Sequence, residues 1–358
     1  MVTSFLLYFS IFLITAISAE LSIRFKGKIL RFTFAFLTLL TPSLFAGIRY
    51  DVGTDYFSYL RIFSNLEAGN PVRTEFGFNF LNVLIAKLGG DVHFLFFIVS
   101  FLTMAFIYLT LYKNRNSISI GLGIFVFLLF FYHDSLNGVR QGLAIAISLY
   151  SLTFIVEKKF WKFFLYTILA TSMHFSSLVL LPFYYIYNVL GDKNRIFRIA
   201  VYLITVVLIF NYGVILDFLL NIFTDFSYYS KYLPDQSVGG LGLGLIAFNA
   251  PLIIPGILFY KRLVKNDERF RFYFFFLLVG VLIKFVGYFG ADHLNRVADP
   301  FFIAVVLIVP YYYKYLKKNE IEYFLGMLII LFIISLWFYN YIFLGQNETI
   351  PFRTIFSQ

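Results

Sequence analysis

The chain has 358 residues, of which 60% are hydrophobic, 22% aromatic and only 13% charged. Because about a quarter of the residues in a soluble domain are charged, this composition excludes an ordinary soluble domain and predicts a polytopic membrane protein. The net charge is +10, but Lys and Arg lie in short loops between apolar runs, which argues against nucleic-acid binding. The lack of cysteine excludes disulfides, thiolate metal sites and a cysteine nucleophile.

Apolar runs of roughly 20 residues are long enough to cross a bilayer. The first run has no basic segment before it, so we expect a retained span and not a signal peptide. We expect about ten full spans, at 2–19, 29–46, 91–112, 117–132, 139–156, 196–216, 244–260, 270–289, 297–313 and 321–344. The expected fold is therefore all-α, a single membrane domain over residues 1–358, with outer loops at 47–90 and 217–243.

The basic loops predict the orientation of these spans. The loop at 20–31 carries Arg24, Lys26, Lys28 and Arg31, so it should be cytoplasmic, with the N-terminus and residues 47–63 outside. The basic loops at 113–115, 157–162, 261–271 and 314–318 then also face the cytoplasm, and the C-terminus lies outside.

This orientation requires that neither of two further apolar segments makes a single crossing of the membrane. The first, 75–88, is short and polar-flanked, and we expect an amphipathic helix on the outer face. The second, 162–188, lies between two basic loops that both favour the cytoplasm. We expect a re-entrant hairpin of two short helices that meet at His174-Phe175-Ser176-Ser177, since broken helices are tolerated where they are buried in protein or line a wet cavity.

The stretch GIRYDVGTDYFSYLRIF, residues 47–63, brings charged groups to a membrane boundary. Arg49 is followed by Asp51 and Asp55, which would share one face of a helix. Gly53 favours instead a turn in which the two carboxylates converge. An ordinary interfacial loop with exposed charges and a tyrosine belt is the alternative.

Three further segments place polar groups near the outer surface. HDSLNGVRQGLAIA, residues 133–146, puts Arg140 at the start of a span after a turn at Asn137-Gly138, where it can contact a phosphate or serve as a snorkelling anchor. Lys284 lies inside a predicted span, where a lysine usually faces protein or a wet cavity. ADHLNRVADPF, residues 291–301, places His293 and Arg296 on one helical face.

His174 is a lone histidine in an apolar segment, where such residues are usually structural; its place at the expected hairpin tip leaves a structural and a functional role equally open. The sequence lacks HExxH, DxD and GxSxG motifs and the glycine patterns of nucleotide-binding sites. Dispersed outer arginines with aromatics suit a ligand with a lipid tail, a diphosphate head and a sugar. Arginines can compensate the charge of a diphosphate leaving group, so we expect no metal and no cofactor.

RYDVGTDYFSYL, starting at Arg49, resembles the R-x-x-x-G-T-D-Y-x-x-Y signature of the EpsG-type family of bacterial polysaccharide polymerases, relatives of the Wzy O-antigen and capsule polymerases. The similarity continues with E-x-G at Glu75 to Gly77, R-Q-x-L-A-x-A from Arg140, and a basic pair followed by H-F-S-S from His174. The motifs occur in order over most of the chain, whereas 217–243 matches nothing.

The resemblance implies an enzyme, a glycosyltransferase that joins undecaprenyl-diphosphate-linked oligosaccharide repeat units on the outer face of the bacterial cytoplasmic membrane. Its partners would be these donor and acceptor lipids, a Wzz-type chain-length regulator and a flippase. As catalytic residues we expect His174, Asp55 and Asp51; as diphosphate contacts Arg49, Arg140, Arg296, Lys284 and Arg353; as sugar contacts Glu75, Tyr56, Tyr59, His133, Gln141 and His293.

Other functions stay open at this stage. A lipid-linked oligosaccharide flippase would also be polytopic and cationic, although it should show charges along a path through the membrane and two related halves. A membrane O-acyltransferase could use an intramembrane histidine. An O-antigen ligase shares the donor and the chemistry of a polymerase, and only the motifs separate the two. A membrane scaffold without catalytic activity is the last alternative.

Overall fold

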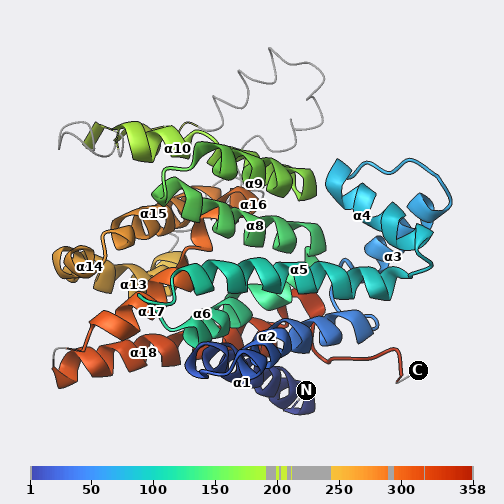
Figure 1. Cartoon of the computed structure of the whole chain (residues 1–358), viewed down its shortest axis with the longest axis horizontal. Coiled ribbons are helices and arrows are strands. Elements are labelled where there is room, and N and C mark those ends of the chain that lie inside the picture. Colours follow the sequence, from blue (N-terminus) through green and yellow to red (C-terminus); the bar gives the residue numbers. More distant parts are fainter. Residues whose placement is uncertain are drawn as a thin grey trace.

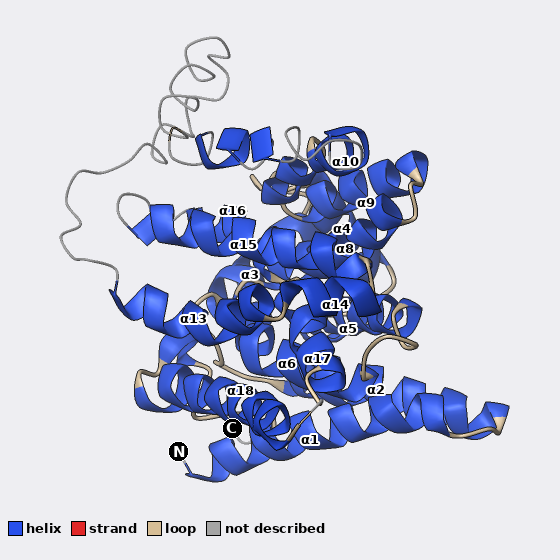
Figure 2. Cartoon of the chain, turned by 90° about the vertical axis from the view of Figure 1, so that its left-hand side faces the viewer, coloured by secondary structure: helices blue, strands red, loops and turns tan. Residues whose placement is uncertain are grey.

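The computed structural model describes residues 2–190, 199–200, 203–207, 211, 243–288, 294–317 and 319–356. These residues form helices joined by short loops (Figures 1 and 2). Within the described ranges there is no strand, and the one extended pairing is an isolated antiparallel bridge between Arg49 and Thr354. The predicted all-α fold is confirmed.

The first half of the chain contains the helices that build the candidate site. They are α1 (Val2–Arg24), α2 (Lys28–Ile48), α3 (Tyr56–Glu67), α4 (Phe76–Lys87), α5 (Val92–Lys113), α6 (Ile120–Phe127), α7 (His133–Asn137), α8 (Val139–Val156) and α9 (Phe160–Met173). A π-helical turn, η1 (Leu128–Tyr132), joins α6 to α7. After α9 come η2 (Phe175–Leu180), α10 (Phe183–Tyr185) and η3 (Ile186–Leu190).

The second half adds helices around the first. They are α13 (Leu243–Leu258), α14 (Tyr260–Asn266), α15 (Arg269–Tyr288), α16 (Leu294–Phe302), α17 (Val305–Tyr315), α18 (Glu320–Trp337), η5 (Phe338–Phe343) and η6 (Gln346–Glu348). Some helix starts follow from side-chain caps, because Asp91, Ser119 and Asn319 each accept a hydrogen bond from a backbone N–H of the first turn.

Eight helical stretches within the described residues are long and apolar enough to span a membrane, and α13 with α14 forms a ninth that bends by 69°. Nine of the ten predicted spans correspond to these stretches. The tenth, 196–216, and the predicted outer loop 217–243 lie almost wholly outside the described residues. The chain is thus a polytopic membrane protein, with a bend where the prediction had one straight helix at 244–260.

Both segments expected not to cross adopt the predicted shapes. Helix α4 has 12 residues, which is too short to cross a bilayer. Helix α9 ends at Met173, His174 takes an extended conformation, and the chain turns back through η2 into α10. The ring of Phe160, at the start of α9, lies 5.1 Å from the ring of Tyr184 in α10, so the two arms run antiparallel as a hairpin. The break at His174 therefore confirms the predicted hairpin.

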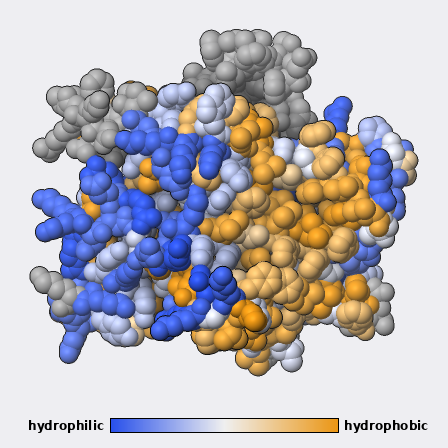
Figure 3. Space-filling model, viewed as in Figure 1, coloured by the Kyte–Doolittle hydropathy of each residue, from blue (hydrophilic) through white to orange (hydrophobic). Residues whose placement is uncertain are grey.

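The long helices run between two polar ends. Figure 3 shows a hydrophilic end on the left, where Figure 1 places α14, a broad apolar surface beside it, and hydrophilic groups again near α3 and α4. The first end carries the basic loops, and ion pairs such as Arg262 with Glu322 and Arg269 with Asp267 join them. At the opposite end, the backbone N–H of Phe352 donates to Ser4 in α1, and that of Ile355 donates to Ile48 at the end of α2. Both chain ends and residues 47–63 thus lie at one end, as predicted.

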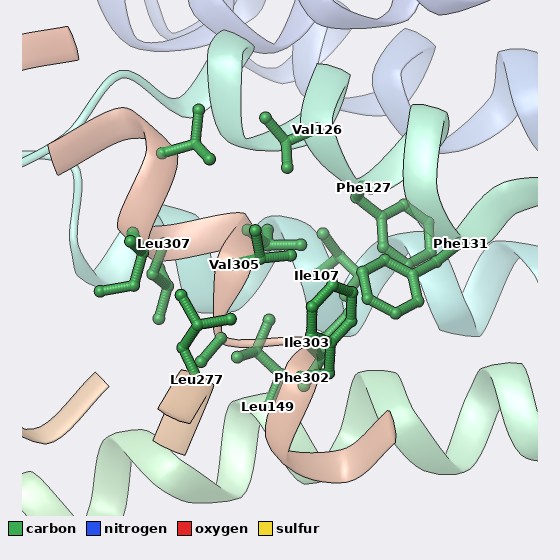
Figure 4. Packing of buried hydrophobic residues seen from close by; sticks show 14 of the residues in the cluster. Ile107, Val126, Phe127, Phe131, Leu149, Leu277, Phe302, Ile303, Val305 and Leu307 are labelled. Atoms are coloured by element: carbon green, nitrogen blue, oxygen red, sulfur yellow. The ribbon is translucent and has the colours of Figure 1, made fainter. Parts of the chain in front are cut away.

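The core fills the space between α5, α6, α8, α15 and α17. Figure 4 shows part of it, with close packing of side chains that come from all of these helices and from the segment that joins α16 to α17. Its labelled members are Ile107, Val126, Phe127, Phe131, Leu149, Leu277, Phe302, Ile303, Val305 and Leu307. This packing sets the ends of α2, α7, α8 and α9 next to one another, which is where the polar residues gather.

Candidate functional site

Arg49 lies directly after α2, at the same end of the molecule as the two chain ends, and its side chain is only 1% exposed. The guanidinium lies 4.2 Å from the ring centre of Phe96 and donates a hydrogen bond to the carbonyl of Leu136. Its Nε and Nη2 atoms have no hydrogen-bond partner within the described part of the chain. Burial lowers the pKa of Arg49 to about 10, so the side chain keeps its proton at neutral pH. The predicted diphosphate contact thus sits inside the protein and not at an open rim.

The predicted turn at residues 51–55 is present. Gly53 has φ +98°, a conformation that favours glycine, and Asp51 has φ +50°. The Asp51 carboxylate, an expected catalytic group, pairs with Arg353 at 2.7 Å. Both side chains of this pair are well exposed, and such pairs contribute little to stability. Asp55 precedes α3 without capping it through its side chain.

Asn137 holds this turn and the C-terminal segment together. Its side-chain oxygen accepts hydrogen bonds from the Thr54 hydroxyl and the Asp55 backbone N–H, each at 2.8 Å. Its amide donates to Asn347 at 3.4 Å, and Asn347 in turn donates to Asp134 at 2.6 Å. The chain breaks here as predicted, with α7 ending at Asn137 and α8 beginning at Val139. The sequence indicated the turn but not the role of Asn137 as a connector.

Glu75 links two other predicted site residues. One carboxylate oxygen accepts from Nδ1 of His174 at 2.9 Å and from the backbone N–H of Phe175 at 3.3 Å. The other forms an ion pair with Arg140 at the start of α8. We call Arg140, Glu75 and His174 the charged triad. All three side chains are largely, but not fully, buried.

The electrostatics of the triad keep Glu75 ionised. Burial alone would raise the pKa of this carboxyl, but the hydrogen bond from His174 and the charge of Arg140 outweigh it and lower the pKa to about 2. A carboxylate on Nδ1 of a histidine orients the ring and, in the neutral tautomer with the proton on Nδ1, leaves the lone pair on Nε2. The arrangement can therefore supply a general base next to a cation.

Gly77 explains how α4 reaches this position. A Cβ atom built on Gly77 would lie 2.7 Å from Cε of Met173 and closer still to the hydroxyl of Ser172, so a larger residue would push α4 away from α9. The E-x-G pattern thus has two separate physical roles. Glu75 binds His174, and Gly77 permits the close approach that makes this bond possible.

A second polar cluster lies on the other side of the start of α8. The ammonium of Lys284 lies 3.1 Å from a carboxylate oxygen of Asp299 and 4.1 Å from the ring centre of Phe302. The side chain of Gln141 donates to the other carboxylate oxygen of Asp299 at 2.8 Å. Lys284 thus faces protein, as expected of a lysine inside a span. The structure adds Asp299, which the sequence did not single out as a site residue.

Several predicted sugar contacts are core residues. His133 is fully buried, with Nδ1 bonded to the Thr349 hydroxyl at 2.7 Å and Nε2 accepting from Trp337 at 2.9 Å. Neither ring nitrogen is left for a sugar. Tyr56 and Tyr59 are also buried, so their ring faces pack against protein.

The remaining predicted residues form no hydrogen bond or ion pair with the triad within the described part of the chain, or lie outside that part. Arg296 is exposed on α16, and Arg353 lies on the C-terminal segment. His293 is outside the described residues. Over the part of the chain that is described, no three His, Asp or Glu side chains gather as metal ligands.

Comparison with known proteins gives one result. The model of the EpsG family matches residues 30–354, which includes every residue of the triad, of the turn and of the second cluster. No match was found among curated proteins or among solved structures.

Proposed function

The chain belongs to the EpsG family, and from this premise we propose that it polymerises undecaprenyl-diphosphate-linked oligosaccharide repeat units. The EpsG family is the family of Wzy-like polysaccharide polymerases. The reaction would transfer a growing glycan from its lipid diphosphate to a sugar of a second lipid-linked unit. It would take place on the outer face of the bacterial cytoplasmic membrane, with both chain ends outside.

The observation that carries the proposal is the charged triad. In the proposed step, the acceptor hydroxyl gives its proton to Nε2 of His174, and its oxygen bonds to the anomeric carbon of the donor sugar. The bond from that carbon to the diphosphate oxygen breaks, and undecaprenyl diphosphate leaves with the electron pair. Glu75 orients the ring and stabilises the imidazolium that forms. His174 is favoured over Asp55 as the base because it alone is oriented by a carboxylate.

Negative charge develops on the diphosphate as it leaves, and cations must compensate it. Arg140 lies beside the proposed base and is the first candidate. Arg296, Lys284 and Arg353 are further candidates. Arg140, Lys284 and Arg353 would each have to share their charge with a carboxylate, of Glu75, Asp299 and Asp51 respectively. With cations in this role, the proposed transfer proceeds without a metal. A Wzz-type chain-length regulator and a flippase are the proposed protein partners.

The test is the length distribution of surface polysaccharide in a strain that lacks the gene. The strain is complemented with wild type, His174→Ala, Glu75→Gln or Arg140→Ala at matched protein levels. Arg24→Ala is the control, since Arg24 is an exposed arginine at the basic end of the molecule. We expect a ladder only with wild type and the control, and single repeat units with the three triad variants.

Two outcomes would contradict the proposal. A ladder that persists in the deletion strain would exclude a polymerase and favour a transporter or an acyltransferase. Polymer that accumulates on undecaprenyl diphosphate, without transfer to its final acceptor, would identify a ligase.

A further inference from the structure

Helix α4 carries an exposed apolar face that begins at the charged triad. Phe76 is 79% exposed and Phe80 57% exposed, and their rings stack with centroids 6.4 Å apart. Leu84 and Leu88, the residue directly after α4, are also exposed and follow at four-residue spacing. We call these four residues the α4 stripe.

The stripe is an outward surface and not a gap in the core. The opposite face of α4 is packed, since Phe78, Asn82 and Ile85 are buried. With 12 residues, α4 is about 18 Å long and too short to span a bilayer. A short helix with an uncovered apolar face in a membrane protein lies along the lipid, with that face against hydrocarbon chains.

The position of the stripe relative to the triad indicates which kind of lipid tail would lie against it. Phe76 directly follows Glu75, and Phe175, which is also exposed, directly follows His174. The apolar surface therefore starts at the carboxylate that joins Arg140 to His174 and runs away from it. A lipid whose charged head lies at Arg140 would find a continuous apolar surface for its tail along α4.

We propose that the α4 stripe holds the isoprenoid chain of the lipid-linked substrate, an inference that rests on the function proposed above. The first isoprene units would lie against Phe76 and Phe80, and the following units against Leu84 and Leu88. The contact fixes the distance between the diphosphate and His174, because the same helix carries the stripe and positions Glu75. Bulk membrane lipid is the competing occupant.

Photolabelling separates the two occupants. The probe is an isoprenoid diphosphate without a sugar, which bears a photoreactive group on its chain, added to the full-length protein in lipid nanodiscs. Trypsin cuts after Arg73 and Lys87 and releases α4 as the peptide 74–87. It also cuts after Arg31 and Arg49, and the peptide 32–49 carries a matched control pair, Phe32 and Phe36.

The control pair has the same chemistry at a different place. Phe32 is 73% exposed and Phe36 42% exposed, and their rings stack at 6.3 Å on the lipid side of α2. We expect the probe to label the peptide 74–87. An unlabelled isoprenoid diphosphate should compete with the probe and reduce this label, whereas inorganic diphosphate should not. The pair Phe76→Ser and Phe80→Ser should reduce this label about tenfold, whereas Phe32→Ser with Phe36→Ser should not change it.

Equal labelling of both peptides, or labelling that an unlabelled isoprenoid diphosphate does not reduce, would overturn the inference and identify bulk lipid as the occupant. Phe76→Leu keeps an apolar side chain and should keep the label, which controls for misfolding of the serine variants. Because the probe carries no sugar, the result does not depend on catalysis. Specific labelling in a protein that fails the ladder test would reject the proposed polymerase and retain the isoprenoid site.

Discussion

The triad makes a sharp prediction about Glu75→Gln. The substitution keeps the size of the side chain and its hydrogen-bonding reach but removes the negative charge between Arg140 and His174. In the folded protein the pKa of Glu75 is about 2, against an ordinary value of 4.5. This lowering of the pKa means that folding stabilises the ionised form of Glu75 over the protonated form by roughly 3 kcal/mol.

The sign of the pH dependence follows from this shift. Because the folded-state pKa lies below the unfolded value, the contribution to stability is present above about pH 4.5. It is lost progressively as the pH falls from about 4.5 to about 2. The glutamine variant has no such contribution at any pH. Its stability deficit relative to wild type should therefore be largest at neutral pH and shrink in acid.

The assay is thermal unfolding of the purified protein in detergent, at neutral pH and at steps down to about pH 3. We expect Glu75→Gln to melt several degrees below wild type at pH 7, and the difference between the two melting temperatures to shrink to less than half by about pH 3. Glu67→Gln, an exposed glutamate at the end of α3, controls for the loss of a carboxylate as such. A melting difference that stays constant with pH, or no difference at pH 7, would refute the electrostatic account of the triad.

Three further predictions address the support of the site. Gly77→Ala should cost about 1–3 kcal/mol, seen by thermal melting, and abolish the ladder, because its Cβ collides with Ser172; unchanged melting would show that α4 can shift freely. Arg49→Met should change stability by only about 1 kcal/mol, because removing a buried cation with two unpaired nitrogens offsets the loss of its hydrogen bond to Leu136; a large drop in melting temperature would contradict this account. Asn137→Ala removes three hydrogen bonds of about 1 kcal/mol each, and trypsin should then cleave faster at Arg353; an unchanged cleavage rate would contradict its role as a connector.

The helices and their order could be predicted from the sequence because hydropathy and loop charge act locally. An apolar run of sufficient length must satisfy its backbone internally, so it becomes a helix whatever its neighbours are. The basic loops indicated which helix ends lie together, and the structure places both chain ends beside residues 47–63 as that rule requires. The break at His174 followed from the need to return 162–188 to the same side.

The pairing of polar residues could not be predicted in the same way. Glu75 and His174 are 99 positions apart in the sequence, and Arg140 is 65 positions from Glu75. The motifs marked all three residues but gave no sign that one carboxylate joins the other two. Arg49 and His133 were expected at the surface, and both are buried, because aromatic side chains from other helices close over them.

The sequence by itself thus determined that this protein is a polytopic helical membrane protein, which of the described segments form helices long and apolar enough to cross, and which residues of unusual polarity lie near one end. These properties depend on the free energy of moving a segment into lipid, which is a sum over that segment alone. Only the tertiary structure decided which of those polar residues meet, which are buried, and that α4 presents an apolar face next to the triad. Those properties depend on how helices rotate and pack against one another, which is settled by contacts between residues far apart in the chain.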